Sequence, residues 1–99
     1  SQSKVVQGGE LLVEAETIDH LVGDGQIPPP NVIKIDVEGH EGAVLRGGRD
    51  TFARYQPVIL CDYNDSYTFQ IASDLLSPLG YQVEPGPPVT AVPKRSRTD

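Results

Sequence analysis

Residues 32–41 read VIKIDVEGHE, and this stretch decides the fold. Its first six residues are mostly β-branched and lie between a proline run and a glycine, which predicts a strand over 32–37. Because the apolar character of this strand is nearly continuous, we expect it to be buried on both faces, as in a parallel sheet. Asp36 interrupts it. A carboxylate is costly to bury, so we expect a hydrogen-bond donor or a cation to face Asp36.

Strand and helix patterns alternate on both sides of this stretch. Further strands are predicted at 11–15, 58–61 and 81–83, with a short edge strand at 89–92. Helices are predicted at 16–23, at 41–55 with a break or bend at Gly47 and Gly48, and at 66–79 with a distortion at Pro78. This order calls for right-handed crossovers between parallel strands. We therefore expect an α/β fold with an open, mostly parallel sheet and helices on both faces.

Length and charge exclude several classes of protein. The chain has 99 residues, enough for one small domain, and its only cysteine, Cys61, cannot form an internal disulfide and is expected to be a small buried apolar residue. Residues 1–92 carry five basic and 13 acidic side chains, a net charge of −8, which disfavours nucleic acid as a partner.

The two ends of the chain also give expectations. No apolar run approaches the roughly 18 residues of a membrane span, and no leader is visible, so we expect no membrane association and a cytoplasmic location. The chain contains no methionine, from which we expect that Ser1 follows a cut.

Polar side chains gather where two predicted strands end. The first cluster consists of Asp36, Glu38, His40 and Glu41, and the second consists of residues 62–65, beginning with Asp62. The carboxyl ends of the strands in open α/β sheets are where ligands bind. Ionisable groups at such an edge suit the deprotonation of a hydroxyl or the binding of a divalent cation.

Structural roles are open alternatives for the same residues. Asp36 could cap the following turn, and Glu38 and Glu41 could be first-turn acids that interact with the helix dipole. His40 could be a surface or capping residue, and 62–65 could form only a turn and a helix cap.

The stretch 33–41, IKIDVEGHE, followed by AVLRGG at 43–48 and QPVIL at 56–60, closely resembles the signature of the FkbM-type methyltransferases. ETIDHL at 16–21 is similar to a stretch found upstream of that signature, and LGY at 79–81 resembles its closing helix-to-strand turn. The resemblance covers about residues 11–83. It leaves 1–10 as an N-terminal turn region and 84–99 as a proline-rich, partly disordered tail.

The resemblance implies an S-adenosylmethionine-dependent O-methyltransferase with a partial Rossmann-like sheet. Its acceptor would be a hydroxyl of a small molecule or a sugar. Asp36 would orient or deprotonate that hydroxyl, or bind a divalent cation that does so, with Glu38 or His40 assisting. Asp62 stands where the family more usually has glutamate, so the carboxylate is kept on a shorter side chain.

One part of the family's pattern is absent from the sequence. Methyltransferases of this class hold the donor with a glycine-rich turn after the first strand and an acidic residue after the second. Neither is found here, so the match is to the C-terminal half of the catalytic domain. The chain is expected to have no cofactor-binding residues and to bind S-adenosylmethionine weakly or not at all.

Two other functions remain open at this stage. The chain could be a non-catalytic half-domain whose uncovered sheet edge pairs with another chain, giving a homo-oligomer. It could also be a cation-binding module that uses Asp36, Glu38 and Asp62.

Overall fold

The computed structural model describes residues 4–6, 10–13, 17–23, 25, 27–36, 39–62 and 66–94. Six strands form one sheet in the order β1-β2-β3-β4-β6-β5. The strands are β1 (Lys4–Val6), β2 (Glu10–Val13), β3 (Val32–Ile35), β4 (Val58–Cys61), β5 (Tyr81–Glu84) and β6 (Val89–Pro93). The helices are α1 (Ile18–Gly23), α2 (Glu41–Arg46), α3 (Arg49–Tyr55), α4 (Ser66–Leu76) and the 3-10 turn η1 (Ser77–Leu79).

The sheet is mixed, and the expectation of a mostly parallel sheet is wrong. Strands β2, β3 and β4 run parallel to one another, whereas β1 with β2, β4 with β6, and β5 with β6 pair antiparallel. The parallel part comes from the two predicted strand–helix–strand crossovers. The antiparallel part arises because β5 and β6 follow each other through a short proline-rich loop, which allows a hairpin but no crossover.

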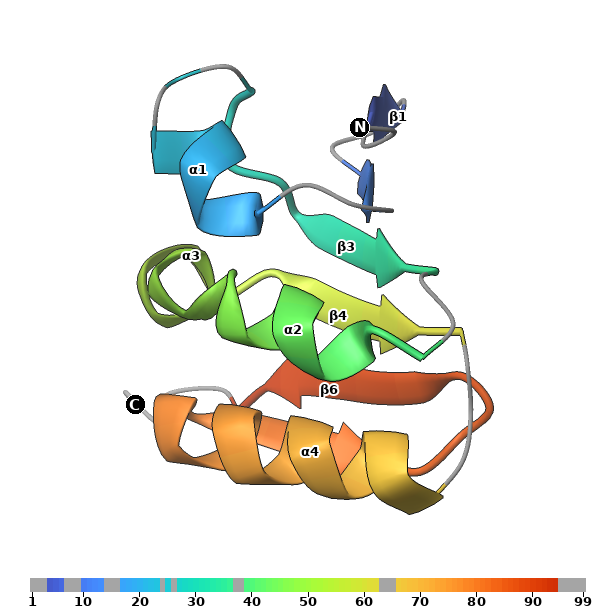
Figure 1. Cartoon of the computed structure of the whole chain (residues 1–99). Coiled ribbons are helices and arrows are strands. Elements are labelled where there is room, and N and C mark those ends of the chain that lie inside the picture. The colour runs from blue at the N-terminus through green and yellow to red at the C-terminus, as the bar shows by residue number, and fades with distance from the viewer. Residues whose placement is uncertain are drawn as a thin grey trace.

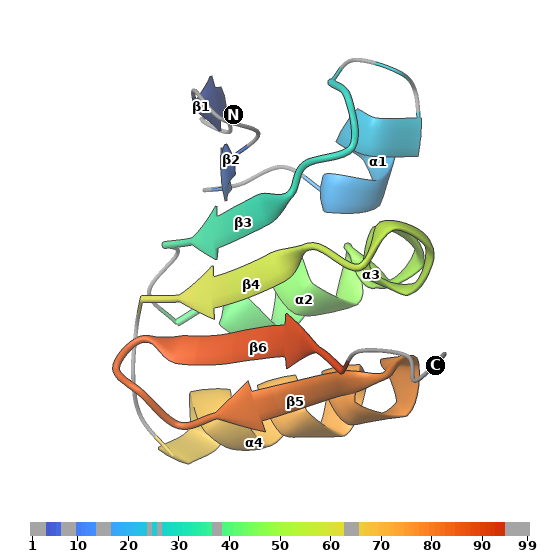
Figure 2. The ribbon, with the colours of Figure 1, turned by 180° about the vertical axis from the view of Figure 1, so that it is seen from behind.

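Helices α2, α3 and α4 pack on one face of the sheet (Figures 1 and 2). In the described part of the chain no helix covers the other face of strands β3, β4, β6 and β5 (Figure 2). The expectation of helices on both faces is therefore wrong for these residues. The core lies between the sheet and the helices, and its largest fully buried side chains include Ile33, Ile35, Phe52, Ile59, Leu76 and Tyr81.

Strand β3 is buried on one face only, contrary to expectation. Ile33 and Ile35 are fully buried, while Lys34 between them is exposed. Successive side chains of a strand point to opposite faces, so Lys34 lies on the face without helices. The stretch that looked continuously apolar in fact alternates.

The predicted break at Gly47 and Gly48 is confirmed, because helix α2 ends and helix α3 begins there. A Cβ atom at Gly48 would lie 2.5 Å from Cζ of Phe52 and 3.0 Å from Cδ1 of Ile18, so any larger residue would force the Phe52 ring to shift. The predicted distortion at Pro78 is also confirmed, since the last turn after α4 is the 3-10 turn η1. Gly80 ends it with φ +95°.

Two strands differ from the sequence-based expectation. Strand β1 lies in the segment expected to form only a turn region, and β6 lies between β4 and β5 instead of at an edge. Residues 89–93 of the expected tail thus belong to the sheet, while 95–99 lie outside the described residues. The flank of β3, expected to be uncovered, pairs in parallel with β2.

Candidate functional site

Two aspartates lie side by side at the carboxyl ends of the parallel strands. Ile35 and Cys61 are register partners at the ends of β3 and β4. Asp36 directly follows β3, and Asp62 directly follows β4. The N–H of Asp62 donates a hydrogen bond to the Ile35 carbonyl at 3.0 Å, which extends the pairing of the two strands by one residue. The pairing of the backbone thus brings together two of the predicted site residues that are 26 positions apart in the sequence.

The Asp36 and Asp62 side chains are both exposed. The expectation that Asp36 is buried within the strand is therefore wrong, because β3 ends at Ile35 and Asp36 begins the turn that follows. An exposed carboxylate does not incur the desolvation cost of burial, so it needs no buried partner. At this position it is accessible to a molecule that binds at the edge of the sheet.

Of the other two predicted site residues, the structure describes His40. His40 is exposed and is the residue before helix α2, where its side chain makes no capping hydrogen bond. Glu38 lies outside the described residues. The structure thus brings His40 to the same strand end as Asp36 and leaves the role of Glu38 as a prediction.

Glu41, the first residue of α2, is a buried carboxylate that is only 4% exposed. Both of its oxygens face the N–H of Gly39, at 3.1 and 3.2 Å. Gly39 has φ +89°, a backbone conformation that favours glycine. The Glu41 carboxylate stabilises this conformation by accepting the Gly39 N–H. The helical pattern contains the signal for this burial, because position 41 falls on the same face as the buried Val44 and Leu45.

Cys61 is buried at the end of β4, as expected, and is 1% exposed. Its burial, and then the nearby charges of Glu41 and Asp62, raise the pKa of its thiol from 9.0 to about 12. The folded chain holds this proton more tightly than the unfolded chain. The resulting stabilisation is therefore complete below pH 9.0 and is lost as the pH rises toward about 12. Cys61 is thus a core residue and no nucleophile.

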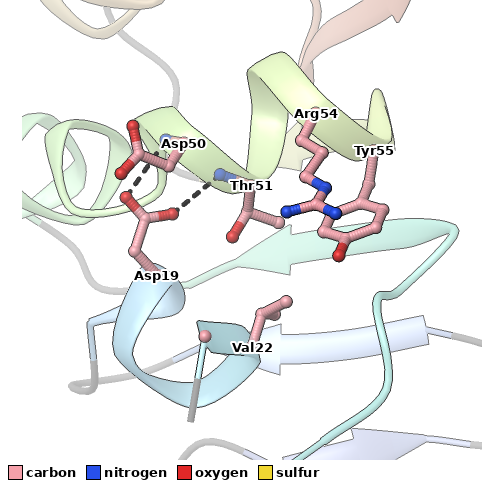
Figure 3. Close-up of a pocket in the computed structure, with 7 residues that line it drawn as sticks. Asp19, Val22, Asp50, Thr51, Arg54 and Tyr55 are labelled. Atoms are coloured by element: carbon pink, nitrogen blue, oxygen red, sulfur yellow. Dashed lines mark hydrogen bonds between the residues drawn. The ribbon is translucent and has the colours of Figure 1, made fainter. Parts of the chain in front are cut away.

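Asp19, in the stretch upstream of the signature, joins two helices. Its Oδ1 accepts the N–H of Thr51 at 2.8 Å, and its Oδ2 accepts the N–H of Asp50 at 3.1 Å (Figure 3). Its own N–H donates to the Gly47 carbonyl at 2.8 Å. The residue at the N-cap of α3, Gly48, has no side chain, so Asp19 caps this helix from 31 positions away.

A pocket of about 230 Å³ lies beside this cap, between α1 and α3 (Figure 3). Arg54 and Tyr55 line it, and the Arg54 guanidinium lies 5.3 Å from the centre of the Tyr55 ring. Helices α1 and α3 stand at the amino-terminal ends of β3 and β4, away from Asp36 and Asp62 (Figure 1). A second pocket of about 340 Å³ lies over the helices, between Arg46, Arg49 and α4. Neither pocket includes a predicted site residue.

Comparison with known protein families matches residues 1–83 to the FkbM methyltransferase domain. This chain belongs to that family. The range matched to the FkbM domain includes both the stretch 36–41 and the upstream TIDHL stretch. The upstream Asp19 connects α1 to the residues between α2 and α3 through its hydrogen bonds. Helix α2 begins directly after the candidate residue His40.

One relative is the hexuronic acid methyltransferase AglP of Haloferax volcanii. The two sequences are 48% identical over 44 residues, which is 44% of this chain and 18% of that protein. The matched segment thus spans less than a fifth of the relative's length. The comparison with solved structures found no match.

S-adenosylmethionine is the methyl donor that the FkbM methyltransferase family implies. We tested whether the strand-to-helix connections of this structure fit it. These connections, 14–17, 36–40 and 62–65, contain one glycine, Gly39. Its N–H is engaged by Glu41. A donor site of this class needs a glycine-rich turn with free N–H groups, so these connections do not fit the donor.

Proposed function

We propose that this chain supplies the acceptor side of an S-adenosylmethionine-dependent O-methyltransferase, as the C-terminal half of its catalytic domain. The acceptor is a hydroxyl of a small molecule or a sugar. The observation that carries the proposal is the pair of exposed carboxylates, Asp36 and Asp62, at the carboxyl ends of neighbouring parallel strands.

Asp36 is assigned to the acceptor hydroxyl. Its carboxylate would accept a hydrogen bond from the hydroxyl and take its proton as the oxygen becomes a nucleophile. Asp62, on the neighbouring strand, would hold the same hydroxyl or an adjacent one. Two acceptor groups next to each other suit a polyol such as a sugar. The name of the Haloferax volcanii relative, a hexuronic acid methyltransferase, supports this substrate class.

His40 and Glu38 are assigned supporting roles at the same turn. His40 is exposed, and the two ring nitrogens of a histidine can donate and accept hydrogen bonds, which suits the relay of a proton from the site to water. The binding of a divalent cation needs further ligands. Among the described residues no group of three His, Cys, Asp or Glu side chains is placed to hold a metal ion. Glu38 lies outside these residues, so the cation stays a prediction.

The proposal is tested by a chimera in which residues 11–83 replace their counterpart in the Haloferax volcanii enzyme. We expect the chimera to transfer a methyl group to sugar hydroxyls, measured as labelled product from a labelled donor. The binding of the donor, measured separately, is the control that the chimera is intact. A chimera that binds the donor but methylates no hydroxyl would contradict the proposal.

A further inference from the structure

An exposed aromatic side chain lies at the same edge of the sheet as the two aspartates. Tyr67 is in the first turn of α4, and in the described part of the chain it is the most exposed large apolar side chain, at 71%. Helices α2 and α4 both begin at the edge where β3 and β4 end (Figure 1). Because the side chains of a helix tilt toward its N-terminus, the Tyr67 ring is directed toward this edge.

The packing of α4 against α2 places Tyr67 on the side of α4 that faces the turn with His40. Ile71 lies one turn after Tyr67 on the same side of α4. A Cβ atom at Gly42, the second residue of α2, would lie 3.2 Å from Cδ1 of Ile71, so this side of α4 faces the start of α2. His40 directly precedes α2 and is exposed. The rings of Tyr67 and His40 therefore border the candidate site from two neighbouring helices.

The face of the Tyr67 ring is free to bind a ligand. Tyr55, the other exposed tyrosine of the described residues, has the Arg54 guanidinium 5.3 Å from its ring centre. No cation lies over the Tyr67 ring within the described residues. Tyr67 also lies on the helix-covered side of the sheet (Figure 1). A donor half that packs on the face without helices would thus leave Tyr67 accessible.

We propose, building on the proposed function, that Tyr67 binds one face of the acceptor's sugar ring and so presents a hydroxyl to Asp36 and Asp62. A sugar ring carries hydroxyls around its rim and C–H groups on its faces. The negative face of an aromatic ring attracts such C–H groups, while carboxylates accept hydrogen bonds from the hydroxyls. An exposed aromatic ring beside two carboxylates therefore selects a sugar over an alcohol without a ring.

The first test measures sugar binding by the purified chain and needs no catalysis. The probe is methyl β-glucopyranoside, titrated into the chain and followed by NMR. We expect weak binding, which Tyr67→Ala weakens by about three- to tenfold, the usual worth of one ring contact. Tyr67→Phe keeps the ring and is expected to leave the dissociation constant nearly unchanged. Tyr55→Ala is the matched control, because it removes an exposed tyrosine from α3, and it should have no effect.

The second test uses the methyl-transferring chimera. Tyr67→Ala is expected to raise KM for the sugar by the same factor and to leave kcat within a few-fold, because the ring binds the acceptor and takes no part in proton transfer. This separates Tyr67 from Asp36, whose replacement is expected to lower kcat. Circular dichroism checks that each variant is folded.

Two outcomes would overturn the proposal. One is a chain that binds no sugar, and the other is a chain whose affinity for the sugar is the same with and without the Tyr67 ring. Both leave the proposed function standing if the chimera methylates hydroxyls. A chimera that binds the donor and methylates nothing would contradict the proposed function instead, while a loss of sugar binding in Tyr67→Ala would still support the sugar contact of Tyr67.

Discussion

Replacing Asp36 by alanine in the methyl-transferring chimera is expected to reduce turnover by about 10²- to 10⁴-fold, the usual contribution of a positioned general base. The affinity for the donor is expected to stay nearly unchanged. Asp36 is exposed and directly follows β3, so its replacement is expected to remove a carboxylate without disturbing the sheet. The measurements are the turnover rate and the dissociation constant of the donor.

Asp50→Ala is the matched control for this variant. Asp50 is also exposed, but it lies on α3, beside the pocket at the opposite ends of the strands. Turnover of this control is expected to stay within a few-fold of the parent. Asp36→Asn, which keeps the shape of the side chain, should be as slow as the alanine variant. If Asp36→Ala and the parent turned over at the same rate, Asp36 would have no part in the mechanism.

Gly48→Ala is expected to lower the free energy of unfolding of the chain by about 1–3 kcal/mol, the cost of overpacking a core. The added methyl would lie 2.5 Å from Cζ and 2.9 Å from Cε1 of Phe52, whose side chain is fully buried. The ring cannot move away easily, because it packs in the core between α3 and the sheet. Urea denaturation followed by circular dichroism measures this change.

Two further variants isolate this steric cause. Gly23→Ala is the control, since nothing lies within 4 Å of a Cβ atom at Gly23, and it should leave stability nearly unchanged. Phe52→Leu removes the ring atoms that clash. The double variant Gly48→Ala with Phe52→Leu should therefore be more stable than the sum of the two single changes predicts. Strict additivity would show that the clash is not the cause.

Local patterns predicted most of the helices and strands. Strand β4 has its predicted bounds, because a short apolar run between Pro57 and Asp62 leaves little choice. The pair Gly47 and Gly48 divides the predicted helix as expected, since glycine weakens a helix interior. These features depend on residues that are close together in the sequence, so they can be predicted from the sequence alone.

Strand order and the covering of the faces could not be predicted in the same way. Strand β6 lies inside the sheet because it pairs with β4, nearly 30 residues earlier, and no local signal specifies such a partner. Lys34 sits between two isoleucines, a nearly continuous apolar pattern that predicts a strand buried on both faces. Whether the lysine face is covered depends on elements elsewhere in space.

The candidate site was predicted in part. The family signature places Asp36 and Asp62 at neighbouring strand ends, and the register confirms that these positions are adjacent. Their exposure was not predicted, because it depends on where β3 ends. The burial of Glu41 and the capping role of Asp19 became evident only in the structure, because they rest on contacts across a turn and between two helices.

Titration of the chain with S-adenosylmethionine in a calorimeter tests the central claim most directly. That claim is that this FkbM chain carries the acceptor side of the site without the donor side. Because no strand-to-helix connection offers a glycine-rich turn, we expect weak binding or none. A dissociation constant in the micromolar range, about −8 kcal/mol of binding free energy, would contradict the account.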